Sequence, residues 1–337
     1  MKVRPTTPIP ELSVVVVIFA GGKHILRCLE TLACQEGMAN VEILIPYDER
    51  SSGIPDLQGQ FPTIRFLPVH GHCTYAQLRA LGVREARGAI VALTEDHCIP
   101  DRFWCARILE AHKGSHAVVG GVVEKQVPDT GLNWALYLSD YGRYMSPMAE
   151  GTVDELTDCN VSYKRSTLEA IADVWRNEFH EPIVHGALQA RGESMWLSPR
   201  IVVQQQRSLR LREAIRDRYL FGRLFGSGRI SRGQGAGSKT QGATSREQKT
   251  GSAWLWRVMY MGGAVALPLL LVGRVAGHVL RKRRYGAAFV RGLPALVLLN
   301  TAWACGEFVG YVTGRPAACL APQAQIVSAR SQVRAAT

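Results

Sequence analysis

Residues 74–104 read TYAQLRALGVREARGAIVALTEDHCIPDRFW, and this stretch decides the fold. Its first half, up to Gly88, is typical of a helix, and AIVAL at 89–93 is a short apolar run typical of a buried strand. The strand breaks into two carboxylates, an imidazole and a thiol at residues 95–98. A metal site, a catalytic site and the capped start of a helix near Asp101 are all compatible with these four residues.

The same alternation of strand and helix signals extends over residues 11–125. β-branched runs such as LSVVVVIFA at 12–20 are separated by stretches with helical spacing of apolar residues. This order predicts an α/β fold with a Rossmann-like, mostly parallel sheet and helices on both faces. In such sheets ligands bind beyond the carboxyl ends of the strands. Asp48, which follows VEILIPY, and the acidic turn after AIVAL are both expected at that edge.

Composition narrows the class of protein. The chain has 337 residues, 47% of them hydrophobic, and a net charge of +12. Between Gln206 and Lys249 there are 11 basic and 3 acidic residues. Such a local excess favours contact with an anionic surface such as lipid headgroups, and no nucleic acid partner is expected. The eight cysteines form no Cys-x-x-Cys pair, which argues against a zinc ribbon or a disulfide framework and favours a reducing cytoplasm.

The C-terminal third has a different pattern. Residues 253–280 and 287–314 are two apolar segments, each long enough to cross ~30 Å of hydrocarbon. A Gly-, Ser- and Gln-rich linker is predicted at 226–252, and a disordered tail at 315–337. A buried helix pair of a soluble protein is the alternative reading. Whether the segments span the membrane, dip into it or lie on it stays open, because a simple crossing would put RKRR (281–284) outside.

Four features in order make residues 11 to about 225 resemble the family-two glycosyltransferases of the GT-A fold. They are the opening strand and helix, the second strand with its acidic turn, the stretch into the family's Asp-x-Asp motif, and DCNVSYKRSTLEAI at 158–171. The resemblance implies a GT-A domain at 1–225, and the two apolar segments at 253–314 are expected to be membrane-associated from their length and composition. It also implies inverting transfer of a sugar from a nucleotide-sugar donor to a lipid-linked or polysaccharide acceptor at the cytoplasmic membrane face.

The resemblance also assigns residues on the donor side. Asp48 falls on the acidic turn that contacts the nucleotide base, and Arg79 falls on a basic position beside the nucleotide. Asp96 falls on the last acid of Asp-x-Asp, which binds the metal ion and the diphosphate. Glu95 occupies the middle of that motif.

The metal site departs from the family pattern. Thr94 replaces the first acid of Asp-x-Asp, so Glu95 or His97 is expected to assist Asp96 in holding Mg²⁺ or Mn²⁺. The loop after the first strand, FAGGKH at 19–24, also lacks the family's usual Asn and Glu. These departures support an alternative, a catalytically silent membrane adaptor of the same fold that binds a nucleotide or a glycan.

On the acceptor side, Glu181 is the expected catalytic base, because the resemblance places an acid at the start of a helix there. A carboxylate can deprotonate the acceptor hydroxyl, and a first-turn acid that only stabilises the helix is the alternative. Asn160 is expected to orient substrate, Trp134 to stack on a sugar or lipid, and His185 to contact metal or acceptor. Each of these three has a purely structural alternative.

Overall fold

The computed structural model describes residues 9–18, 24–36, 40–49, 51, 53–126, 129–235 and 248–315. They fall into two compact units. Unit 1 comprises Met1–Val127 and Tyr144–Arg207, and unit 2 comprises Pro128–Arg143 and Ser208–Thr337. Residues 236–247 of the predicted linker, and the predicted tail from residue 316 onward, lie outside the described residues.

Unit 1 is built on a nine-stranded sheet in the order β3-β2-β1-β4-β8-β6-β9-β5, with β7 paired to β9. The strands are β1 (Leu12–Val17), β2 (Val41–Asp48), β3 (Arg65–Val69), β4 (Ile90–Glu95), β5 (Cys98–Pro100), β6 (Val118–Lys125), β7 (Gly151–Thr152), β8 (Asn160–Lys164) and β9 (Met195–Gln205). The first four strands pair in parallel, as expected. The α/β class is therefore confirmed, but the sheet is mixed, because β8 runs antiparallel to both β4 and β6.

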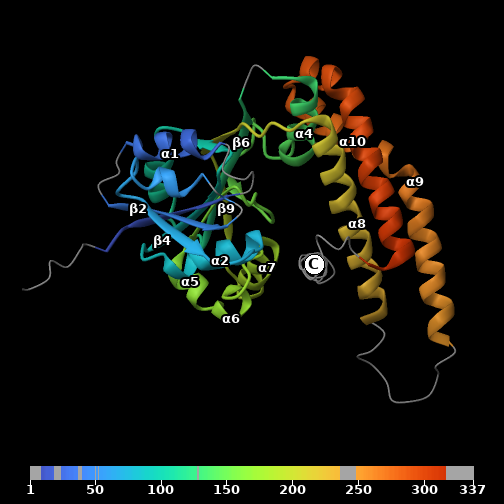
Figure 1. Cartoon of the computed structure of the whole chain (residues 1–337), viewed down its shortest axis with the longest axis horizontal. Helices are drawn as coiled ribbons and strands as arrows, with labels where there is room; N and C mark the ends of the chain where they lie inside the picture. The colour runs from blue at the N-terminus through green and yellow to red at the C-terminus, as the bar shows by residue number, and fades with distance from the viewer. Residues whose placement is uncertain are drawn as a thin grey trace, which may run out of the picture. The chain divides into compact units, whose positions relative to one another are not determined.

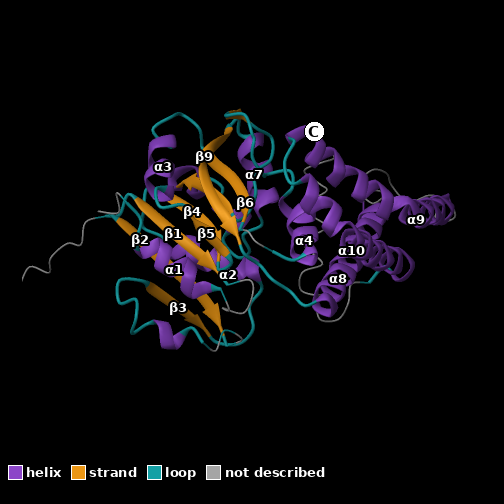
Figure 2. Ribbon diagram, turned by 90° about the horizontal axis from the view of Figure 1, so that it is seen from above, coloured by secondary structure: helices purple, strands orange, loops and turns teal. Residues whose placement is uncertain are grey.

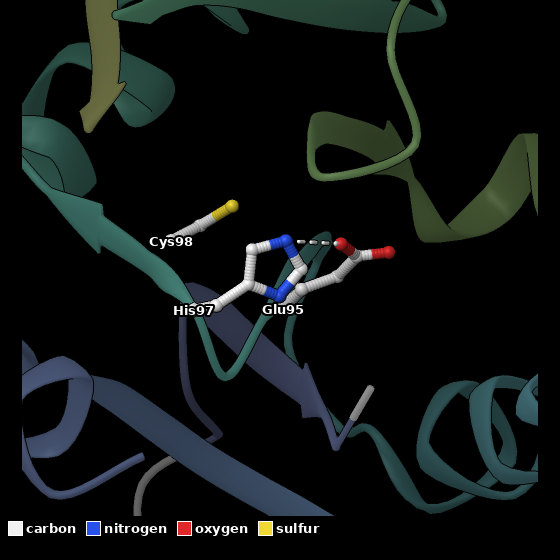
Figure 3. Close-up of side chains that lie close together, drawn as sticks. All are labelled: Glu95, His97 and Cys98. Carbon is white, nitrogen blue, oxygen red and sulfur yellow. Dashed lines mark ion pairs between the residues drawn. The ribbon is translucent and has the colours of Figure 1, made fainter. Parts of the chain in front are cut away.

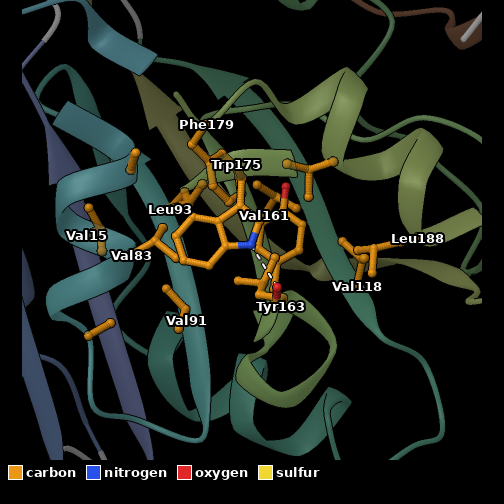
Figure 4. Packing of buried hydrophobic residues seen from close by; sticks show 14 of the residues in the cluster. Val15, Val83, Val91, Leu93, Val118, Val161, Tyr163, Trp175, Phe179 and Leu188 are labelled. Carbon is orange, nitrogen blue, oxygen red and sulfur yellow. Dashed lines mark hydrogen bonds between the residues drawn. The ribbon is translucent and has the colours of Figure 1, made fainter. Parts of the chain in front are cut away.

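Helices cover this sheet on both faces, and Figure 1 shows α1 and α2 on opposite sides of the strands. The helical elements of unit 1 are α1 (Ile25–Ala33), η1 (Pro55–Leu57), α2 (Tyr75–Glu85), α3 (Trp104–Ala111), α5 (Arg165–Glu169), α6 (Ala172–Trp175) and α7 (Glu181–Ala190). A capping box between Thr74 and Gln77 starts α2. A buried hydrophobic cluster packs Val91, Leu93 and Tyr163 of the sheet against Trp175 and Phe179 (Figure 4).

The parallel register brings the polar strand ends together, as predicted. Val17 at the end of β1 is paired with Glu95 at the end of β4. Asp48 ends β2, the other neighbour of β1. β8 begins at the same edge, because Asn160 is the partner of Thr94 in the antiparallel ladder. Residues from four strands therefore converge at one edge of the sheet.

Unit 2, as far as it is described, consists of helices (Figure 2). They are α4 (Gly131–Tyr141), α8 (Leu211–Gly235), α9 (Gln248–Lys282) and α10 (Gly286–Thr313). The predicted linker at 226–252 therefore overlaps helix at both ends, and the predicted boundary at residue 225 falls inside α8. Among the described residues, one helix, α10, is long and apolar enough to cross a membrane.

Close backbone packing explains why the Gly-rich end of α8 is helical. A Cβ atom at Gly222 or Gly226 would lie 2.2 or 2.3 Å from a carbonyl oxygen of α10. A Cβ atom at Gly306 or Gly310 of α10 would lie 2.0 or 2.4 Å from a carbonyl oxygen of α8. Small residues four apart on each helix let two backbones approach closely. Gly226, the first glycine of the predicted linker, therefore contributes to helix packing together with Gly222.

The buried carboxylate of Glu307 lies between α8 and α10. Glu307 of α10 pairs with Arg229 of α8 at 3.2 Å and accepts a hydrogen bond from Trp303 Nε1 at 3.0 Å. The Tyr311 hydroxyl also donates to Glu307. A buried charge persists only when it is paired and hydrogen-bonded, so Glu307 has a structural explanation within unit 2.

Candidate active site

Arg79 joins the predicted base to the acidic strand end. Its guanidinium, carried by α2, lies 2.8 Å from Glu95 Oε1 and 2.6 Å from Glu181 Oε1. Asp158 Oδ2 lies 3.6 Å from the same guanidinium. Arg79, Glu95 and Glu181 are each at most 7% exposed. Three residues that were predicted separately on sequence grounds are thus brought into one buried ion cluster.

The loop after β4 adds an imidazole to this cluster. His97 Nε2 lies 3.3 Å from Glu95 Oε2, and His97 Nδ1 lies 3.4 Å from Asp96 Oδ1 (Figure 3). Asp96 and His97 are fully buried. Backbone hydrogen bonds fix the loop, because Asp96 N–H donates to Val17 and Gln206 N–H donates to His97. Glu95, Asp96 and His97 therefore form one fixed acidic loop.

Burial sets the electrostatics of the cluster. Desolvation, with the nearby Asp158 charge, raises the pKa of Glu95, although His97 and Arg79 partly oppose the shift. Desolvation would lower the pKa of Arg79, but the charges of Glu181, Asp158 and Glu95 outweigh it and raise that pKa. Arg79 is therefore a permanent cation among carboxylates, suited to facing an anionic ligand.

Asp158 is a cluster member that the sequence reasoning missed. It stands two residues before β8, and its side chain is 35% exposed. The stretch DCNVSYK had been used only for Asn160. A signal was present: an acid just before an antiparallel strand lies at the same edge as the carboxyl ends of the parallel strands. Recognising it required knowing that β8 runs antiparallel.

Asp48 is placed at the expected edge, at the end of β2. It is 2% exposed, and its Oδ2 accepts a hydrogen bond from Cys73 N–H at 2.9 Å. This contact ties β2 to the segment that leads into α2. Its predicted role at the nucleotide base remains a prediction.

Asn160 makes internal hydrogen bonds with both ends of its amide. Its Nδ2 donates to the carbonyl oxygens of Val122 and Ile201, at 2.9 and 3.1 Å, and its Oδ1 accepts from Trp104 Nε1 at 2.8 Å. The side chain is 1% exposed. These bonds tie β8 to β6, β9 and α3, which favours the structural alternative for Asn160.

Trp134 is not part of the cluster of unit 1. It lies on α4 of unit 2, where it is 4% exposed. Its indole ring packs against the rings of Tyr285 and Tyr137, with centroid distances of 4.7 and 5.8 Å. These neighbours favour a core role over stacking on a sugar or lipid.

His185 lies one turn after Glu181 but bonds to the core. Its Nε2 is 2.8 Å from the Tyr163 hydroxyl, and Tyr163 packs edge-on against Phe179. Burial lowers the pKa of His185 to about 4, so its imidazole is neutral at physiological pH. A second buried histidine, His112, bonds to Ser162 Oγ at 2.8 Å, and burial lowers its pKa to about 3.

These two histidines predict acid lability of unit 1. The unfolded chain binds these protons near pH 6.5, whereas the folded chain binds them only near pH 4 or below, so protons favour unfolding. The contribution of the two neutral histidines to the free energy of unfolding is fully present above pH 6.5 and is lost as the pH falls towards 4. For His185 the loss approaches about 3 kcal/mol. In urea unfolding at pH 7.5 and 4.5, His185→Gln should lose less stability than wild type, while the exposed His72→Gln should match it. An equal acid loss in both variants would contradict this account.

Comparisons with known proteins agree with the resemblance seen in the sequence. Residues 13–172 match the family model described as glycosyl transferase family 2. Glycosyltransferase AglE of Haloferax volcanii is 26% identical over 133 residues, a match that covers 37% of this chain and 43% of that protein. The chain thus spans less than half the length of this relative.

Solved structures of similar proteins have low sequence identity. A mannosyltransferase of Pyrobaculum calidifontis, in complex with GDP-Man and Mn²⁺, is 17% identical with a TM-score of 0.46, and the match covers 97% of this chain and 87% of that one. TarS residues 1–349 of S. aureus, in complex with UDP, is 12% identical with a TM-score of 0.41, covering 59% and 61%.

The matched residues include Arg79, Glu95, Asp96, His97 and Asp158 of the cluster, whereas Glu181 lies beyond them. By sequence, residues 13–172 therefore resemble a family-two glycosyltransferase domain. The mixed sheet of unit 1, with helices on both faces, agrees with the α/β class that the sequence predicted.

Proposed function

We propose that this chain is an inverting glycosyltransferase that moves a sugar from a nucleotide-sugar donor to an acceptor hydroxyl. The observation that carries the proposal is the Arg79 cluster, which holds Glu181 and the acidic loop together at the ligand edge of the sheet. A transferase needs a base at the acceptor and positive charge at the departing diphosphate. Glu181 and Arg79 supply these two groups.

The roles follow from the placement of each side chain. Glu181, in the first turn of α7, accepts the proton of the acceptor hydroxyl. A carboxylate accepts a proton only when it is ionised, and the adjacent guanidinium favours that form. Arg79 and the Asp96 loop face the donor diphosphate, and Asp48 contacts the nucleotide base. His185 and Asn160 stabilise the surrounding strands and helices through their buried hydrogen bonds.

A divalent cation fits the acidic loop by the chemistry of its donors. Glu95 and Asp96 offer the carboxylate oxygens that Mg²⁺ and Mn²⁺ prefer. Four carboxylates, those of Glu95, Asp96, Asp158 and Glu181, gather around the guanidinium of Arg79 and the imidazole of His97. Added positive charge is therefore favourable here. When bound, the cation would neutralise charge on the departing nucleoside diphosphate.

The acceptor is proposed to be lipid-linked or a polysaccharide, reached at the cytoplasmic face of a membrane. Support comes from unit 2, where α10 is long and apolar enough to span a bilayer. Leu269, Leu270, Leu280 and Val290 are each at least 65% exposed, although they are large apolar residues. Exposed apolar patches mark contact surfaces, and the basic turn at 281–284 suits anionic headgroups.

The test is release of nucleoside diphosphate. The full chain in detergent would be given nucleotide sugars, including GDP-mannose and UDP-GlcNAc, with divalent metal and membrane-lipid extract as acceptor source. We expect release with at least one donor, and its loss in Asp96→Asn but not in the exposed Asp56→Asn. Nucleotide binding without release, for every donor, would instead favour the silent adaptor.

A further inference from the structure

We propose that Glu95, His97 and Cys98 form a binding site for zinc. The carboxylate, imidazole and thiol ligand atoms of these three residues all lie within 4.8 Å of one another, and all three residues are buried. Figure 3 shows the His97 ring between the side chains of Cys98 and Glu95. The inference shares Glu95 with the cation site of the proposed function and rests on that loop binding a metal, but its test measures metal binding and not sugar transfer.

The spacing of two of the ligand atoms is already that of a tetrahedral site. Zinc binds histidine nitrogen and carboxylate oxygen at about 2.0–2.2 Å, so two such ligands at the tetrahedral angle lie about 3.4 Å apart. His97 Nε2 and Glu95 Oε2 lie 3.3 Å apart. An ion can therefore enter between them with little movement of either side chain.

Contacts with Arg79 and Asp96 hold the Glu95 carboxylate and the His97 ring in place. Glu95 Oε1 accepts a hydrogen bond from Arg79, which leaves Oε2 directed at His97. His97 Nδ1 lies 3.4 Å from Asp96 Oδ1. Metal-binding histidines commonly donate their second ring N–H to a carboxylate, which fixes the tautomer and ring orientation. Asp96 thus has the position of an orienting residue for a ligand at Nε2.

The sulfur donor decides which metal fits best. Thiolate and imidazole ligands suit zinc, whereas Mg²⁺ and Mn²⁺ prefer oxygen ligands. Cys98 follows His97 directly on β5, and its thiol is hydrogen-bonded to that of Cys159. A second sulfur atom, that of Cys159, therefore lies beside the Cys98 thiol. The chain has a nitrogen and a sulfur donor beside the carboxylate at the strand end.

Cobalt substitution tests the site without any donor sugar. The full chain in detergent would be stripped with a chelator and titrated with Co²⁺. We expect a near-ultraviolet thiolate-to-cobalt charge-transfer band that disappears when zinc is added. In Cys98→Ser the band should be lost and zinc affinity should fall at least about tenfold. Cys34→Ser, at an exposed cysteine, should leave both unchanged.

Two results would overturn the proposal. One is the absence of the thiolate-to-cobalt charge-transfer band in the wild-type protein. This measurement does not require that any variant fold. The other is unchanged zinc affinity in Cys98→Ser, which would show that the Cys98 thiol is not a ligand of any bound metal. Circular dichroism of each variant verifies its fold, and His97→Gln provides a second ligand variant if Cys98→Ser does not fold.

Discussion

Glu181→Gln is expected to lower the transfer rate by about 10²- to 10⁴-fold, the contribution typical of a positioned general base. Glutamine keeps the volume of the side chain and leaves an amide oxygen next to the guanidinium of Arg79. It cannot accept the acceptor's proton. The loss should therefore appear in kcat, while the affinity for the nucleotide-sugar donor changes little.

Glu178→Gln is the matched control. Glu178 stands three residues before Glu181 and pairs with His180 at 3.1 Å, outside the Arg79 cluster. Its loss should leave kcat near the wild-type value. If Glu181→Gln keeps most of the transfer rate, the base lies elsewhere and Glu181 is only a structural partner of Arg79. Initial rates of nucleoside diphosphate release, measured with the acceptor saturating, separate these outcomes.

Much of the fold could be predicted because its signals are local. The run at Leu12–Val17 and the capping box before α2 act within a few residues, so strand and helix are visible in the sequence. The shared edge of Asp48 and the acidic loop then follows from parallel pairing alone. The reversal at β8 depends on pairing between distant segments, and no local pattern in Asn160–Lys164 specifies it.

The site was predicted as a set of residues but not as an arrangement. Arg79 and Glu181 are distant in sequence and meet only when α2 and α7 pack on the same face of the sheet. Cys98 is likewise hydrogen-bonded to Cys159, from the segment before β8, and this contact depends on pairing between distant parts of the chain. The Gly-rich composition after residue 225 predicted a linker, whereas α8 extends to Gly235. Composition does not separate the two cases, because glycine is common both in flexible linkers and where helices pack closely.

The ion cluster predicts a large loss of stability in Arg79→Gln, of about 3–5 kcal/mol. The side chains of Glu95 and Glu181 are each 5% exposed, so without Arg79 two buried charges lose their nearest cation. Asp158 contributes less, because its carboxylate is 35% exposed and water screens it. Arg84→Gln, at an exposed position one turn further along α2, should change stability by no more than about 0.5 kcal/mol.

A double variant shows whether charge, rather than lost packing, causes the effect. Arg79→Gln with Glu181→Gln removes one of the stranded carboxylates together with the cation. If charge dominates, the double variant should be more stable than Arg79→Gln alone, and the two changes should be clearly non-additive. Strictly additive losses would mean that Arg79 acts through its packing in α2. Chemical unfolding in detergent, followed by near-ultraviolet circular dichroism, measures all four proteins of the cycle. A non-additive result would establish that Glu181 is ionised in the folded protein, the state in which a base can accept a proton.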